Sequence, residues 1–189
     1  MHLKNFQSHF LMLTHSKPFL LRTVVLDCRE ANEFNVSRIP GAFNLPFSQF
    51  KMDQAGSQDQ SESTTEAKGE KSPHLLVDIL GLEVKKHLGR ELQVNDEMDV
   101  ICYCSLGYRS SVIAQRILEL REEGHLPPGV EPHNLRGSIF QWASEGRNLT
   151  RAELSDERRG CVETQVTTVH PFSRLWGSLA LPFSLWQWE

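Results

Sequence analysis

The sequence has few cysteines and no long apolar run. Only four of its 189 residues are cysteine, too few for a disulfide-built scaffold, and their spacing matches no paired zinc-ligand pattern. A reducing compartment is the simpler interpretation, and we expect the protein in the cytoplasm. No stretch reaches the roughly 18 apolar residues that a membrane-spanning helix needs, so an integral membrane protein is excluded.

Neither sign of charge dominates the chain. It has 20 Lys and Arg against 24 Asp and Glu, a net charge of −4 at pH 7. This mild acidity gives no global field that holds nucleic acid or an anionic membrane, and no local basic patch replaces it. We therefore expect no nucleic-acid partner. Residues 1–22 are basic and contain no acidic residue, as in a transit peptide, so the mitochondrion is the alternative location.

The length fits one globular domain with extensions. We predict an N-terminal segment over 1–22, a domain over 23–149 and an aromatic-rich tail over 150–189. Residues 53–73 contain only alanines as apolar residues and cannot bury enough surface to offset their ordering entropy, which predicts a disordered insert. Three of the four tryptophans lie in the tail. We prefer a tail that folds back over the domain, and docking of a protein partner or a membrane interface is the alternative.

Alternating apolar patterns predict an α/β fold. Residues 23–28 are a continuous apolar run rich in β-branched residues, typical of a strand covered on both faces. The other expected strands cover 98–103, 42–45 and 134–135, and the expected helices cover 31–37, 75–88, 110–122 and 139–144. In the second helical region Gly81 and Gly89 are expected as breaks or caps. The alternation predicts a parallel sheet with helices on both faces.

The loop after the strand over 98–103 carries the most reactive side chains. It lies at the carboxyl end of a parallel strand, where α/β proteins place ligands. The thiol of Cys104 lies there at the positive end of a helix dipole, near backbone N–H groups that stabilise a thiolate. Gly107 permits a tight turn, Arg109 supplies positive charge at the rim, and Ser110 caps the helix. We therefore predict a nucleophilic Cys104 rather than a small buried hydrophobe.

The other cysteines have simpler interpretations. Cys102 is expected to pack in the core, because two ligands do not make a zinc site and no histidine follows at ligand spacing. A resolving thiol is its alternative. Cys28 ends its own strand and is an alternative redox partner at the same end of the sheet. Cys161 lies in the polar part of the tail and gives no information.

Three motifs occur in the order known from one family, which rarely happens by coincidence. They are Val25-Leu26-Asp27-Cys28-Arg29-Glu30 with Glu33-Phe34 and Arg38-Ile39-Pro40-Gly41-Ala42; the loop Cys104-Ser105-Leu106-Gly107-Tyr108-Arg109-Ser110; and Asn134-Leu135-Arg136-Gly137-Ser138-Ile139 with Trp142 and Gly146. Over residues 23–149 the chain resembles a rhodanese-like, single-domain sulfurtransferase.

The resemblance implies a rhodanese-like fold, a small parallel sheet flanked by helices on both faces. By position, Cys104 matches the persulfide-forming cysteine of the family. The residues that match its anion-cradling loop are Ser105, Leu106, Gly107, Tyr108 and Arg109, followed by Ser110. Asp27 and Arg29 match a pair that braces the fold near the site, and we expect a structural salt bridge. No metal or organic cofactor is implied.

Two departures from the family pattern stand out. Ser37-Arg38 replaces the usual Gly-His before Ile39, which adds a cation that we do not expect to touch the nucleophile. The usual amphipathic helix before the first strand is poorly represented in residues 1–22.

The spacing within the loop separates sulfur from phosphate chemistry. Cysteine-dependent phosphatases have five residues between the cysteine and the arginine, whereas Cys104 and Arg109 enclose four. The smaller ring of N–H groups suits one persulfide sulfur better than a phosphoryl group. We expect a sulfurtransferase of the thiosulfate type that moves a sulfane sulfur from a small donor to a thiol or cyanide acceptor. The alternatives are a rhodanese-like binding module with little or no catalysis and, less favoured, a phosphatase with Asp96 or Asp99 as its acid.

Overall fold

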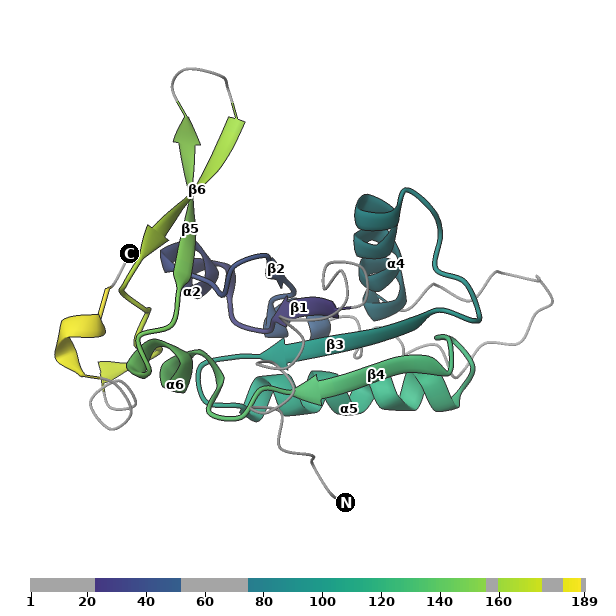
Figure 1. The fold of residues 1–189 in the computed structure, drawn as a ribbon. Coiled ribbons are helices and arrows are strands. Elements are labelled where there is room, and N and C mark those ends of the chain that lie inside the picture. Colours follow the sequence, from purple (N-terminus) through teal and green to yellow (C-terminus); the bar gives the residue numbers. More distant parts are fainter. Residues whose placement is uncertain (1–22, 52–74, 156–159, 175–181, 188–189) are drawn as a thin grey trace, which may run out of the picture.

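A parallel sheet of four strands forms the centre of the fold (Figure 1). The computed structural model describes residues 23–51, 75–155, 160–174 and 182–187, so the predictions for 1–22 and 53–73 lie outside the described residues. The strands, in the spatial order β2-β1-β3-β4, are β2 (Phe43–Asn44), β1 (Thr23–Asp27), β3 (Glu97–Tyr103) and β4 (Gly129–Asn134). All three adjacent pairs are parallel, as predicted.

Helices cover both faces of this sheet, because successive side chains of a strand point to opposite faces. One face packs against α4 (Leu75–Leu88) and α5 (Tyr108–Glu122), and receives Val100 and Cys102 from β3. The other face packs against α2 (Ala31–Val36) and α6 (Ser138–Ser144), and receives Tyr103. The predicted fold class is therefore confirmed. Among the helices in the described ranges, none has both the length and the apolar character needed to cross a bilayer.

Two local expectations need correction. The strand expected near 134–135 is β4, which includes Pro132; an edge strand tolerates the missing N–H group. Gly81 does not break α4, because Leu76, Leu80 and Val84 recur at helical spacing and are all buried in the core, and this packing outweighs the low helix propensity of glycine. Gly89, with φ of +67°, follows the last helical residue as expected.

A hairpin that the sequence did not predict begins the C-terminal region. Strands β5 (Leu149–Ser155) and β6 (Gly160–Val166) are antiparallel. They project upward at the left of Figure 1, beside α2. Arg38 anchors them, since its backbone exchanges hydrogen bonds with Thr150 and its guanidinium contacts the Glu163 carboxylate at 3.0 Å. The division at residue 149 stays a prediction.

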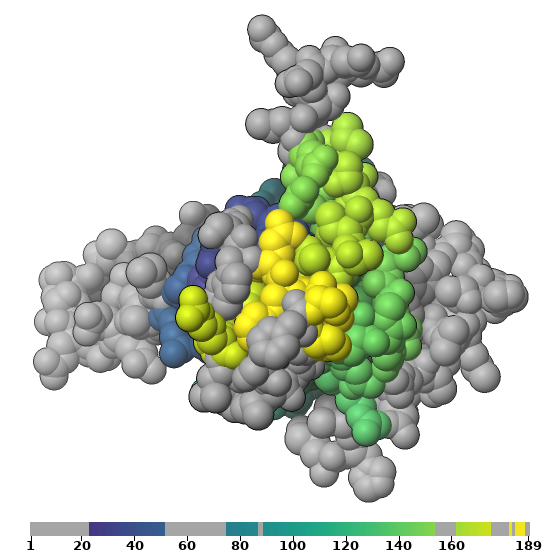
Figure 2. All heavy atoms as spheres, turned by 90° about the vertical axis from the view of Figure 1, so that its left-hand side faces the viewer, coloured from purple at the N-terminus to yellow at the C-terminus, as the bar shows by residue number. Residues whose placement is uncertain are grey.

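The rest of the described tail packs onto the face that carries α6. Val169 is fully buried there, and its backbone N–H donates to the carbonyl of Leu185 at 2.7 Å, next to the 3-10 turn Phe183–Leu185. Figure 2 shows residues 162–174, 182 and 184–187 spread over the side of the molecule toward which the arrowheads of β3 and β4 point. The preferred prediction, a tail folded back over the domain, holds for the part of the tail around Val169 and Leu185.

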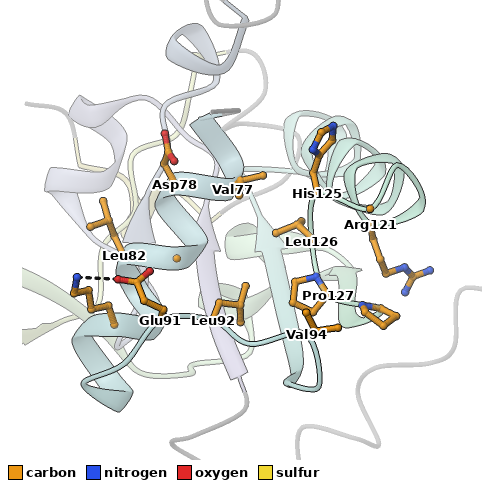
Figure 3. A pocket seen from close by; sticks show the side chains of 14 residues that line it. Val77, Asp78, Leu82, Glu91, Leu92, Val94, Arg121, His125, Leu126 and Pro127 are labelled. Carbon is orange, nitrogen blue, oxygen red and sulfur yellow. Dashed lines mark hydrogen bonds and ion pairs between the residues drawn. The ribbon is translucent and has the colours of Figure 1, made fainter. Parts of the chain in front are cut away.

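A cavity of about 940 Å³ opens at the other end of the sheet (Figure 3). It lies between α4, the segment before β3 and the end of α5, and its lining includes Val77, Leu92 and Leu126. No residue of the loop 104–110 lines it. The cavity therefore does not belong to the predicted site.

A buried ion pair closes the carboxyl end of β1. The guanidinium of Arg29 donates to the Asp27 carboxylate from Nε at 3.0 Å and from Nη2 at 2.6 Å, and both side chains are completely buried. Nη2 also donates to the Ser37 carbonyl at 2.5 Å, where α2 ends. The salt bridge expected between these residues is present, and it ties β1 to the end of α2.

We expect Asp27→Asn to lower the free energy of unfolding by about 3–5 kcal/mol, because the charge of Arg29 stays buried without its carboxylate. Urea denaturation measures the loss. Glu91→Gln is the matched control, since the Lys85–Glu91 pair is 60% and 71% exposed and its removal should cost less than about 1 kcal/mol. Equal small losses in both variants would contradict the prediction.

Candidate active site

The carboxyl ends of β1 and β3 form the switch point of the sheet. The chain passes from β1 to β2 on one side and from β3 to β4 on the other, so the connections that follow these two adjacent strands run in opposite directions. Open α/β sheets bind ligands in the crevice at such a point. Cys104 follows β3 and Arg29 follows β1, so both sequence motifs meet at this crevice.

The Cys104 thiol lies in a nest of hydrogen-bond donors. It is 2% exposed, and the Gly107 N–H donates to its Sγ at 3.0 Å. Burial raises the pKa of this thiol, but hydrogen bonds from the Ser110 backbone and hydroxyl and from the N–H groups of Gly107 and Leu106 outweigh burial, so the pKa falls below its ordinary value. The site therefore favours the thiolate, the form that acts as a nucleophile.

Helix α5 begins earlier than predicted, and this changes the role of Ser110. Gly107 is the residue that precedes the helix, with φ of +114° and ψ of −10°, a conformation that favours glycine. Ser110 is in the first turn and fully buried; its hydroxyl donates to the Asn134 Oδ1 at 2.8 Å. The Asn134 amide in turn donates to the Gly107 carbonyl at 3.0 Å. Ser110 therefore does not cap the helix, and its single proton serves either Asn134 or the Cys104 sulfur.

Arg109 is paired with a buried carboxylate. Its Nη1 and Nη2 donate to the two Glu33 oxygens at 2.6 and 2.8 Å, and Nη2 also donates to the Ser105 hydroxyl at 2.9 Å. That hydroxyl donates to Glu33 at 2.9 Å. Burial raises the pKa of Glu33, but Arg109 outweighs it and lowers the pKa. A guanidinium only 11% exposed needs such a carboxylate partner. Burial lowers the pKa of Arg109, but Glu33 and then Cys104 outweigh burial and raise it, so the predicted positive charge lies at the loop and is shared between Glu33 and Cys104.

The other loop residues and the tail form the outer wall. Leu106 is 42% exposed and Tyr108 is 73% exposed, so their side chains face outward. Phe172 of the tail lies over Arg109, with 4.9 Å from its ring centroid to the guanidinium carbon. Its backbone, at φ of +64°, donates to Nδ1 of His170 at 3.1 Å. The tail thus covers the outer side of the Arg109–Glu33 pair.

Helix α6 holds the loop from the other side. The Cys104 N–H donates to the Ser138 hydroxyl at 3.2 Å, and the Ile139 N–H donates to the Cys104 carbonyl at 3.1 Å. The Ile139 N–H, like the Phe140 N–H that donates to the Ser105 carbonyl at 3.3 Å, belongs to the first turn of α6 and has no partner within the helix. The backbone around Cys104 is therefore fixed by two helix N-termini.

Sequence reasoning assigned no role to three residues of this network. Glu33, Asn134 and Ser138 all stand in the quoted motifs, but none was a candidate for the site. The signal for Glu33 was its spacing from Glu30, because the two form a capping box at the start of α2. Asn134 ends β4 and Ser138 begins α6, on either side of a short turn. Both come close to the loop because β4 pairs with β3.

The structure describes the side chains of two of the three remaining cysteines, Cys102 and Cys28. Cys102 is fully buried in the core, as expected. Cys28 is also buried, at the crevice end of β1. The side chain of Cys161 lies outside the described residues. Within the described ranges, no three His, Cys, Asp or Glu side chains are grouped so that they could hold a metal ion.

Comparison with known proteins gives one family. A model described as the rhodanese-like domain matches residues 14–145, more than half of the chain. No curated protein matches significantly. Similar solved structures include an uncharacterized protein from Saccharomyces cerevisiae (20% identity, 75% of this chain and 90% of that chain, TM-score 0.40). An As-Sb reductase from Leishmania major is also similar (16% identity, 82% of this chain and 88% of that chain, TM-score 0.44). So is a human single-domain sulfurtransferase (17% identity, 74% of this chain and 91% of that chain, TM-score 0.40).

We expect Ser110→Ala to raise the pKa of Cys104, because the hydroxyl is one of the donors that favour its thiolate. The pH profile of iodoacetamide alkylation at Cys104, followed by peptide mass, measures this pKa. Ser111→Ala is the matched control, since the Ser111 hydroxyl donates to the Tyr108 carbonyl instead. An alkylation profile of Ser110→Ala that overlays the wild-type profile would refute the assigned role.

Proposed function

The chain belongs to the rhodanese-like domain family, and from this premise we propose that it is a sulfurtransferase that carries a sulfane sulfur as a persulfide on Cys104. One observation carries the proposal: a buried thiol whose pKa is lowered, with a backbone N–H donor 3.0 Å from its sulfur. Fixed N–H groups around a sulfur anion suit a negatively charged persulfide, since they need no reorganisation as charge develops.

The reaction we propose is a double displacement. The Cys104 thiolate attacks the sulfane sulfur of a small donor such as thiosulfate, the S–S bond of the donor breaks, and sulfite leaves with the electron pair. Cys104 then holds the outer sulfur as a persulfide anion. A thiolate or cyanide attacks that sulfur, and the Cys104 thiolate returns. Two simple steps replace one difficult step, and no metal or organic cofactor takes part.

Three sets of residues stabilise the sulfur anion or hold the site in shape in this proposal. The N–H groups of the loop, above all that of Gly107, stabilise the sulfur anion. Arg109 and Ser105 act through Glu33 to hold the loop in shape. Asp27 and Arg29 brace the end of β1 beside it. In the double displacement, Cys104 is the residue to which we assign covalent chemistry.

A phosphatase is less well supported. Its general acid would have to lie near the loop, but Asp99 is five residues before Cys104 on an extended strand, about 16 Å away at 3.3 Å per residue. Asp96 lies still farther along and is paired with Arg90 at 2.6 Å. The four-residue spacing between Cys104 and Arg109 points the same way.

A rhodanese-like binding module with little or no catalysis is the second candidate. The C-terminal region favours it, because the tail covers part of the site and a protein partner at its aromatic residues would explain that region. The intact nucleophile and its ordered donors favour the enzyme. We place the protein in the cytoplasm, with the mitochondrion as the alternative.

We expect purified protein to form thiocyanate from thiosulfate and cyanide with parallel double-reciprocal lines, and Cys104→Ser to lose about three orders of magnitude or more of this activity. Intact mass should gain one sulfur after thiosulfate in the wild type and not in Cys104→Ser. Cys102→Ser is the matched control, because Cys102 lies on the same strand but packs in the core. Intersecting lines, or activity in Cys104→Ser, would refute the mechanism.

We expect Gly107→Ala to lower kcat/KM for thiosulfate by about 10- to 100-fold, because displacing catalytic groups by an ångström has effects of that size. Alanine rarely adopts φ of +114°, so the N–H donor to Cys104 must shift. Gly124→Ala is the matched control, since Gly124 also has positive φ, +81°, with open space around it, and it follows α5 at the far end of the sheet. Comparable losses of activity in both variants would indicate general destabilisation instead.

A further inference from the structure

Cys28 is a buried thiol that the proposed mechanism does not use. It follows β1 directly, is fully buried, and belongs to the same apolar cluster as Cys102 and Cys104. All three thiols are free. A thiol beside a persulfide-forming cysteine is chemically significant, because it can attack the S–S bond.

The ladder between β1 and β3 places Cys28 beside Cys104. Asp27 pairs with Tyr103, and the Cys28 N–H donates to the Tyr103 carbonyl at 2.8 Å, which extends the parallel ladder by one residue. The lateral neighbour of Cys28 is therefore Cys104. Lateral neighbours have Cα atoms about 4.8 Å apart, within the range of about 4.4–6.8 Å that a disulfide spans.

The side chains of the two cysteines lie on one face and influence each other. Burial, the neighbouring Cys102 and Asp27, and the charge of Cys104 raise the pKa of Cys28 well above its ordinary value. Cys28 therefore holds its proton more tightly than an ordinary thiol, whereas Cys104 releases its proton more readily. The Sγ of Cys28 donates to the carbonyl of Leu26 on its own strand at 3.8 Å. To attack Cys104, the thiol has to give up this contact by rotation about its Cα–Cβ bond.

Cys102 is a poorer partner for the nucleophile. It lies two residues before Cys104 along the same extended chain, which separates their Cα atoms by about 6.6 Å, near the upper limit for a disulfide. Cys102 therefore provides a control of the same chemistry in the same cluster.

We propose that Cys28 is a resolving thiol that discharges the Cys104 persulfide as sulfide when no acceptor arrives. The inference rests on the proposed function. The Cys28 sulfur attacks the inner sulfur of the persulfide, a Cys28–Cys104 bond forms, and the bond to the outer sulfur breaks. The outer sulfur leaves with the electron pair, takes the Cys28 proton and departs as HS⁻. The sulfane sulfur is reduced, the two cysteines are oxidised, and an external thiol restores them.

The test uses the full chain loaded with thiosulfate in the absence of an acceptor and then freed of excess donor. Intact mass and released sulfide are followed with time in the wild type, Cys28→Ser and Cys102→Ser. We expect Cys28→Ser to retain the added sulfur about tenfold longer or more than the wild type. The wild type and Cys102→Ser should release one sulfide per chain, lose two hydrogens relative to the reduced protein, and yield a peptide that joins Cys28 to Cys104.

Equal persulfide lifetimes in the wild type and Cys28→Ser, or a cross-link to Cys102 instead, would overturn the inference. A chain that gains no sulfur in any variant would count against the proposed function. In that case, oxidation with peroxide tests whether Cys28 reacts with Cys104. Peroxide oxidises the Cys104 thiolate to a sulfenic acid, which condenses with Cys28 and releases water. A Cys28–Cys104 cross-link supports the resolving role, and a Cys104 sulfinic acid without a cross-link overturns it.

Discussion

The shape of the reactive loop depends on the ion pair between Glu33 and Arg109. Glu33 comes from α2, which follows β1, and Arg109 comes from the first turn of α5, which follows β3. The pair therefore spans the crevice between the two strands. Ser105 bonds to both partners, so the start of the loop is held by the same contact. Since both side chains are largely buried, removing either one leaves the other charge without its main partner.

This pairing places two kinds of group beside the Cys104 sulfur. The guanidinium of Arg109 is held by Glu33 and also interacts with Cys104, and backbone N–H groups at the start of α5 donate to the sulfur. Dipoles fixed by the backbone do not have to reorient when charge forms. Phe172 covers the guanidinium from outside, and exclusion of water from an ion pair strengthens it. The tail, through Phe172, and the loop, through Ser105, thus both contact the Arg109 guanidinium.

Two neighbouring thiols at this crevice show how environment separates chemical roles. Both are buried, which by itself raises a thiol pKa. Cys104 receives hydrogen bonds from the start of α5, and its pKa is lowered. Cys28 faces Cys102 and the carboxylate of Asp27, and its pKa is raised. Two laterally adjacent cysteines of the ladder therefore differ in the direction of their pKa shift.

The sequence by itself determined the features that depend on neighbours a few residues away. The apolar run at 23–28, the helical spacing of Leu76, Leu80 and Val84, and the strand–loop–helix setting of Cys104 are of this kind. Only the tertiary structure decided the others. Glu33 meets Arg109 because β1 and β3 are adjacent, and Asn134 reaches the loop because β4 borders β3. Phe172 arrives from a tail that follows the β5–β6 hairpin. Such contacts join residues far apart in the chain, and no local pattern encodes which strands become neighbours.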